Sequence, residues 1–422
     1  MGLGDTVIQR RFRLSVAVAG AAAVLVAAAG CGGSSSDGSG GDAGAQGGKT
    51  YTIGVLADIT GPAASGNETS VEGVKAGTYY AEREGIKIKY IVADTATNPT
   101  TALSAAQKLV TQDHVFAVIA HSALAFAAAP YLTAQKIPVI GMPEDGPEWN
   151  TSENMFGITG LYPTGDVTTT TGEIFKKLGA TTIAAIGYAV SPGSQVAAGL
   201  AAESAKAVGL KVGYLNTQLP FGGTDVGPVV LAMKEAGIDG FTAAVDPNTA
   251  FALIKGLRQQ GVEIKAAMLA TGYGGDLVQA GPGALNDAQG VYFSLAYQPV
   301  EMKTAATKQF QADLESAGVT DEPTFAQYNG YTSVGLLVRG LKAAGANPTQ
   351  ASLITALTGI HDWDGLGMFG YKLDINASEF GADGKGECLY IAKLEGDAFE
   401  PVQGALPLCG RVVPGRKVQP SS

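Results

Sequence analysis

The sequence predicts an α/β fold with two lobes, each built on a doubly wound parallel sheet. Between 51 and 270, short apolar runs alternate with helical stretches of about a dozen residues. This alternation is typical of parallel strands that are joined and covered by helices. The apolar runs, such as 115–120, are nearly continuous, as expected for strands buried on both faces. The rhythm pauses near 159–166 and then restarts, which indicates a second lobe.

The first series of elements follows from breakers and caps. Gly61-Pro62 ends the first apolar run, and Asn98-Pro99 has the sequence of a helix start, because proline fits the first turn. We therefore expect helices over 68–83, 100–112 and 124–135. The expected strands of this series are 51–57, 86–93, 115–120 and 138–141.

The second series repeats the same pattern. We expect its helices over 166–177, 193–208, 226–236 and 247–260. The expected strands are 181–187, 211–215, 240–245, 266–270 and 291–295. Two further helices are expected over 303–317 and 324–344, and two extended segments over 368–373 and 389–393.

The N-terminal residues predict export. Three arginines precede an apolar run over 14–29, which ends at Ala28-Ala29-Gly30-Cys31. This ending resembles the bacterial lipobox, which implies a signal peptide over 1–30 and a lipid on Cys31. An ordinary secretory signal with a coincidental cysteine is the alternative. Residues 31–49 are rich in Gly and Ser and predict a flexible tether.

Composition argues against several classes of function. The formal charge is −10, and residues 1–30 carry three Arg and one Asp, so the mature chain is near −12. An acidic chain without a basic patch does not favour nucleic acid as a partner. Three histidines leave little material for a zinc site or a His-based triad, and no dinucleotide-binding glycine motif or nucleophile elbow is present. We expect no enzyme activity, no cofactor and no metal.

Two cysteines remain once Cys31 is assigned to lipid. Cys388 and Cys409 lie either side of an expected hairpin over 389–402. In an exported chain such a pair favours a disulfide bond.

The order of features resembles a known family, the type I periplasmic binding proteins of the branched-chain amino-acid transport group. Each matching piece is short, and their order and spacing together carry the likeness. The pieces are Ile53-Gly54-Val55-Leu56-Ala57 with Thr60-Gly61-Pro62, Asn98-Pro99, Val118-Ile119-Ala120-His121, Ile137-Pro138-Val139-Ile140, Phe156-Gly157-Ile158-Thr159 and Asp246-Pro247 with Leu257-Arg258-Gln259-Gln260-Gly261.

This resemblance implies a hinge of three crossings, near Ile158, Leu295 and Gly367. The N-terminal lobe would then hold 50–158 and 296–366. The C-terminal lobe would hold 159–295 and 367–412, with a tail over 413–422. The ligand would sit in the cleft between the lobes, at the carboxyl ends of strands.

The resemblance also implies a set of ligand-binding positions in the loops that follow the strands. In the first lobe, Ser122 offers the hydroxyl after the third strand, at the start of an expected helix. The full set of candidates is Ser65, His121, Ser122, Ala123, Glu144, Asp145, Tyr188, Ser191, Asp246, Thr271 and Tyr273.

One departure leaves the ligand open. Thr271 stands where the family has the acid that pairs with a ligand ammonium, so either another carboxylate has taken over or the ligand has no amino group. An amino acid and another small acid, amide or aromatic metabolite both remain.

We expect a lipid-anchored binding protein on the outer face of the cell membrane, with an ABC permease and its ATPase as partners. A sensory receptor domain for a membrane partner is the main alternative, and an exported enzyme on a Rossmann-like scaffold is a weaker one.

Overall fold

The computed structural model describes residues 49–143, 146–161, 165–222, 225–279, 283–377 and 385–419. The predicted signal peptide, the predicted lipidation site Cys31, and the candidates Glu144 and Asp145 lie outside these residues. The described chain belongs to one compact unit, Gly48–Ser422. Among the described residues, every helix is too short or too polar to span a bilayer.

The first lobe is built on a five-stranded sheet in which all strands run parallel, as predicted. Its order is β2-β1-β3-β4-β5. The strands are β1 (Thr50–Ala57), β2 (Lys87–Asp94), β3 (Ala117–His121), β4 (Val139–Gly141) and β5 (Met155–Gly157). β3 and β4 are buried along their whole length, which explains their continuous apolar sequence.

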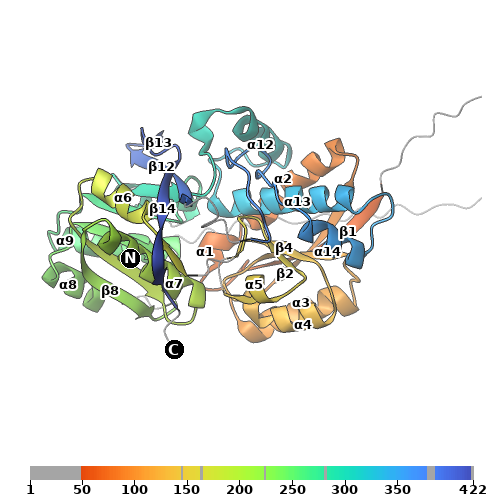
Figure 1. The fold of residues 1–422 in the computed structure, drawn as a ribbon, viewed down its shortest axis with the longest axis horizontal. Helices are drawn as coiled ribbons and strands as arrows, with labels where there is room; N and C mark the ends of the chain where they lie inside the picture. The colour runs from red at the N-terminus through yellow and green to blue at the C-terminus, as the bar shows by residue number, and fades with distance from the viewer. Residues whose placement is uncertain are drawn as a thin grey trace, which may run out of the picture. The chain divides into compact units, whose positions relative to one another are not determined.

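Helices from two distant parts of the chain cover this sheet (Figure 1). From the first part come α1 (Ala64–Asn67), α2 (Ser70–Arg83), α3 (Pro99–Thr111), the 3-10 turn η1 (Ala125–Ala127), α4 (Ala129–Ala134) and α5 (Glu148–Thr151). From the second part come the 3-10 turn η2 (Val300–Met302), α12 (Ala305–Ser316), α13 (Phe325–Ala343) and α14 (Gln350–Thr358).

The contact between α2 and α13 ties these two parts together, and glycines make it close. A Cβ on Gly73 would lie 2.1 Å from the carbonyl oxygen of Gln327, and a Cβ on Gly330 would lie 2.2 Å from that of Ser70. The two backbones therefore touch in a way that only glycine allows.

The second lobe is built on a sheet in the order β6-β14-β12-β11-β10-β9-β7-β8, with β13 paired to β12. The strands are β6 (Asp166–Thr168), β7 (Thr182–Tyr188), β8 (Lys211–Leu219), β9 (Gly240–Ala244), β10 (Ala266–Leu269), β11 (Tyr292–Leu295), β12 (Lys385–Glu395), β13 (Ala398–Pro401) and β14 (Leu408–Lys417). The helices are α6 (Thr170–Lys177), α7 (Pro192–Ala207), α8 (Gly227–Glu235), α9 (Pro247–Gln259), α10 (Asp276–Gln279) and α11 (Ala284–Asp287).

This second sheet is mixed, which differs from the purely parallel sheet that was predicted. β7 to β11 are parallel, whereas β12 pairs antiparallel with β11, β13 and β14. For β12 and β13 the reason is that they form a hairpin, so no helical crossover separates them. Cys388 and Cys409 form a disulfide bond between β12 and β14. β14 continues to Lys417, beyond the lobe end expected at 412.

Several predicted elements have different bounds in the structure. The helix expected over 124–135 is divided into η1 and α4. The helix expected over 68–83 is α2, and the short helix α1 precedes it. The segment 166–177 begins as strand β6, because this part pairs with β14. The segment 368–373 forms a single bridge, between Leu373 and Trp363, where a strand was expected.

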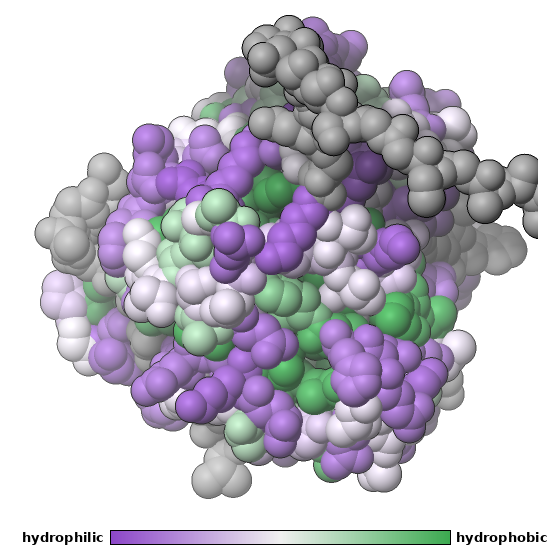
Figure 2. Space-filling view, turned by 90° about the vertical axis from the view of Figure 1, so that its right-hand side faces the viewer, coloured by the Kyte–Doolittle hydropathy of each residue, from purple (hydrophilic) through white to green (hydrophobic). Residues whose placement is uncertain are grey.

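The chain passes from the first lobe to the second after β5, returns after β11, and passes again between α14 and β12. The fold is thus the two-lobed α/β fold that the sequence predicts. Figure 2 shows that one end of the molecule, at the right of Figure 1, carries mostly hydrophilic residues with hydrophobic patches between them.

Candidate functional site

A cavity of about 390 Å³ lies between the lobes. From the first lobe, its wall includes Ala63, Gly66, Asn67, Ala123 and Phe325. From the second lobe, it includes Tyr188, Ser191, Phe221, Asp246 and Thr271. Most of these residues follow the carboxyl end of a parallel strand, where open α/β sheets place their ligand sites.

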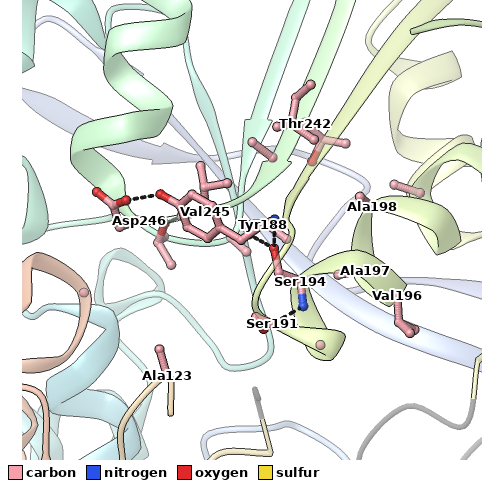
Figure 3. Close-up of a pocket in the computed structure, with 18 of the residues that line it drawn as sticks. Ala123, Tyr188, Ser191, Ser194, Val196, Ala197, Ala198, Thr242, Val245 and Asp246 are labelled. Carbon is pink, nitrogen blue, oxygen red and sulfur yellow. Dashed lines mark hydrogen bonds between the residues drawn. The ribbon is translucent and has the colours of Figure 1, made fainter. Parts of the chain in front are cut away.

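The cavity continues into the second lobe, along α7. Its wall there contains Val196, Ala198 and Ala201 of α7, with Glu387 and Leu389 of β12 beyond them. Small side chains on α7 leave this space unfilled. Figure 3 shows Val196, Ala197 and Ala198 on one side of the pocket, and Tyr188 between Asp246 and Ser194.

A buried carboxylate, Asp58, occupies the loop ends of the first lobe. Its side chain accepts hydrogen bonds from Ser122 Oγ at 2.7 Å, from the backbone N–H of Ala123 at 2.8 Å and from Asn67 Nδ2 at 3.1 Å. Thr95 Oγ1 donates a further bond. Burial raises the pKa of Asp58, and these four donors lower it in part. The hydroxyl of Ser122, which was predicted to hold the ligand, thus bonds to the protein's own carboxylate.

Tyr188 and Asp246 form a second network on the opposite wall. Tyr188 Oη donates to the carboxylate of Asp246 and lies 2.9 Å from Thr249 Oγ1. Asp246 also caps α9, because its Oδ1 accepts from the backbone N–H of Thr249 at 3.1 Å. Burial, followed by the charge of Asp246, raises the pKa of Tyr188. Phe221 packs edge-on against the Tyr188 ring at 4.8 Å.

Hydrogen bonds to neighbouring groups of the second lobe hold the loop after β10 in place. Thr271 lines the cavity and donates from Oγ1 to the carbonyl oxygen of Val245 at 3.0 Å. Asp276 is buried and accepts a hydrogen bond from the backbone N–H of Gly272 at 3.0 Å. Burial raises the pKa of Asp276 to about 7. Tyr273 is not among the described wall residues, and its Oη donates to the carboxylate of Glu301 at 2.7 Å.

Two candidates of the first lobe, His121 and Ser65, have buried polar atoms. His121 is buried, its Nε2 lies 3.1 Å from Ser333 Oγ of α13, and burial lowers its pKa to about 4. The imidazole is therefore neutral at pH 7. Ser65 lies in α1, and its buried hydroxyl finds no hydrogen-bond partner among the described residues. Neither residue belongs to the described cavity wall.

The structure thus brings five of the candidates to the cavity, namely Ala123, Tyr188, Ser191, Asp246 and Thr271. Sequence reasoning missed Asp58, Phe221, Phe325 and Glu387. Asp58 directly follows the first strand, and that position was a usable signal. Phe325 and Glu387 reach the site from segments far along the chain, which no local pattern reveals.

Comparison with known proteins defines the class. The family model described as periplasmic binding protein matches residues 50–398. The chain belongs to this family of extracytoplasmic solute-binding proteins, as the sequence pieces indicated. A search of curated proteins finds no match.

Solved structures share the fold at low identity. The leucine-binding protein LivK of Thermotoga maritima has a TM-score of 0.68 at 16% identity, over 83% of this chain and 97% of that one. A solute-binding protein of an ABC transporter from Rhodopseudomonas palustris, in complex with 4-hydroxybenzoate, has a TM-score of 0.67 at 19% identity, covering 89% and 98%. Another from R. palustris, in complex with benzoate, has 0.65 at 18%, covering 86% and 98%.

Proposed function

We propose that this protein is the lipid-anchored substrate-binding protein of an ABC importer and binds a small solute between its lobes. The observation that carries the proposal is the cavity, which is walled by strand-end residues of both lobes. Its volume suits a small molecule, and its lining is mainly apolar with a few polar groups, as in most ligand sites.

The two lobes meet around this cavity. Gly66 of α1 lies close to Pro247 of α9. A Cβ on Gly66 would lie 3.7 Å from Pro247 Cδ. A Cβ on Gly222 would lie 3.3 Å from Pro62. These contacts support a mechanism in which a ligand that touches both walls stabilises the closed arrangement of the lobes.

In this mechanism the closed, loaded form docks on the permease, and the ATPase on the inner face drives uptake. Lipid on Cys31 holds the protein on the outer face of the cell membrane, and residues 31–49 act as the tether. The proposed binding step needs no covalent chemistry.

A thermal-shift screen of residues 49–422 tests the proposal, since these residues contain the whole described fold. The panel holds amino acids, aliphatic and aromatic carboxylates, amides and amines. A ligand at 100 times its dissociation constant stabilises the folded state by about 2.7 kcal/mol, which is readily measured. The control is the same panel with Phe221→Ala, which removes one wall and is expected to weaken binding.

The absence of a shift with every compound, together with no co-purified small molecule in native mass spectrometry, would contradict the proposed function.

A further inference from the structure

The charge of the cavity wall sets the chemistry of the ligand. None of the described residues that line it is Lys, Arg or His. Two of them, Asp246 and Glu387, are acidic. His121 lies at the end of β3, two residues before the wall residue Ala123. It is neutral at pH 7 because burial lowers its pKa to about 4. A ligand carboxylate would find no opposite charge among these groups.

Neutral donors also bind carboxylates, and at the end of β3 these donors are already used. The backbone N–H of Ala123 and the hydroxyl of Ser122 both donate to Asp58. Asn67, a residue of the cavity wall, donates its side-chain amide N–H to the same carboxylate. Asp58 is fully buried and thus fills this cradle with the protein's own carboxyl group.

Two of the helix N-termini at the cavity, those of α7 and α9, are capped in the same manner. At α7, Ser191 accepts bonds from the N–H groups of Ser194 and Gln195, and Pro192 has no N–H. At α9, Asp246 accepts from the N–H of Thr249, and Pro247 occupies the first turn. A helix N-terminus favours an anion, and at α9 that anion is Asp246 itself.

Glu387, half-buried on β12, is an acidic wall residue that can still accept a hydrogen bond from a ligand. It lines the far end of the cavity, beside Leu389, and its backbone oxygen accepts from Thr170 Oγ1. No described side chain donates to its carboxyl group. Burial alone raises the pKa of Glu387 to about 7. A donor on the ligand would supply the missing hydrogen bond, and a charged donor would also favour the ionised carboxylate.

We infer that this site takes an apolar ligand whose polar group is a hydrogen-bond donor, an amine or an amide, and that it excludes free carboxylates. The inference rests on the proposed function and names the substrate class of the same site. It separates this protein from the structural neighbours that bind benzoate and 4-hydroxybenzoate, although they share its fold.

Matched ligands test the inference. Titration calorimetry with residues 49–422 compares the amine, the amide and the carboxylate on benzyl, 3-methylbutyl and 4-phenylbutyl skeletons. For the skeleton that binds best, we expect the carboxylate to bind at least tenfold more weakly than the amine or the amide. A carboxylate that binds as tightly as either donor compound overturns the inference and leaves the proposed function standing. If none of the nine compounds binds, the inference is overturned. The proposed function is contradicted only if no compound of the full thermal-shift panel binds either.

Variants locate the donor. Glu387→Gln removes the charge at nearly the same volume, and we expect it to weaken the amine at least tenfold and the amide less. The matched control is Glu315→Gln, on the exposed surface of α12, with unchanged affinities. Equal affinity of the amine for wild type and Glu387→Gln overturns the role of Glu387. Asp58→Ala empties the cradle, and it is expected to raise the affinity of the carboxylate.

Discussion

The buried carboxylate of Asp276 makes the stability of the fold depend on pH. Asp276 is fully buried, and its pKa is raised to about 7, above the ordinary value near 4 that it has when unfolded. Between these two values the folded state binds more protons than the unfolded state. The contribution of Asp276 is therefore present below pH 4 and is lost as the pH rises through about 7.

Asp276→Asn is expected to remove this dependence. A shift of about three pH units corresponds to about 4 kcal/mol, so the wild type loses a stabilisation of this order between pH 4 and pH 8 relative to the variant. Urea unfolding of both proteins at pH 4.5, 6 and 8 measures it. His121 contributes in the opposite direction, because its folded pKa is lowered, and comparison of two proteins that both contain it cancels its effect. If the free energy of unfolding changes with pH in the same way in both proteins, the raised pKa of Asp276 is contradicted.

At the residue scale, the sequence predicted the walls of the site better than its charges. Ala123, Tyr188 and Asp246 were found because each follows a strand, and strand ends meet at one edge of a sheet. The position of Asp58 was a usable signal, but its hydrogen-bond donors were not predictable, because they come from α1, from the loop after β2 and from the loop after β3. Only the fold brings those donors together.

At the scale of elements, the close contact between α2 and α13 allows a specific prediction. Gly73→Ala places a methyl group 2.1 Å from the backbone oxygen of Gln327, so one helix must move. We expect the free energy of unfolding to fall by about 3 kcal/mol, the upper range for overpacking. Gly359→Ala is the control, since its Cβ would meet only ordinary contacts at 3.5 Å and beyond. Equal losses in the two variants, by thermal or urea unfolding, would rule out the steric cause.

Several of the strands that the sequence predicted are buried on both faces. Strands β3, β7 and β9 have continuous apolar runs because helices cover both sides of their sheets. Strands β6 and β14 lack this signal, since each is short or largely exposed and is defined by its partner. Pro130 lies inside the helix expected over 124–135, and it is the one helix breaker that could have signalled the division into η1 and α4.

At the scale of the whole molecule, two α/β lobes with three connections place loops from distant segments around one cavity. Neither lobe alone supplies the whole wall of the cavity. If the proposed site is correct, a change on one wall should remove binding without unfolding either lobe.

The affinity of Ala123→Trp for the best ligand tests the central claim most directly. Ala123 lines the cavity from the first lobe, across from Tyr188 in Figure 3, and an indole there would fill the space. We predict at least a hundredfold weaker binding by calorimetry. The control, Ala312→Trp, lies at an exposed position of α12 and should keep the wild-type affinity. Wild-type affinity in a folded Ala123→Trp protein would mean that the ligand binds outside this cavity.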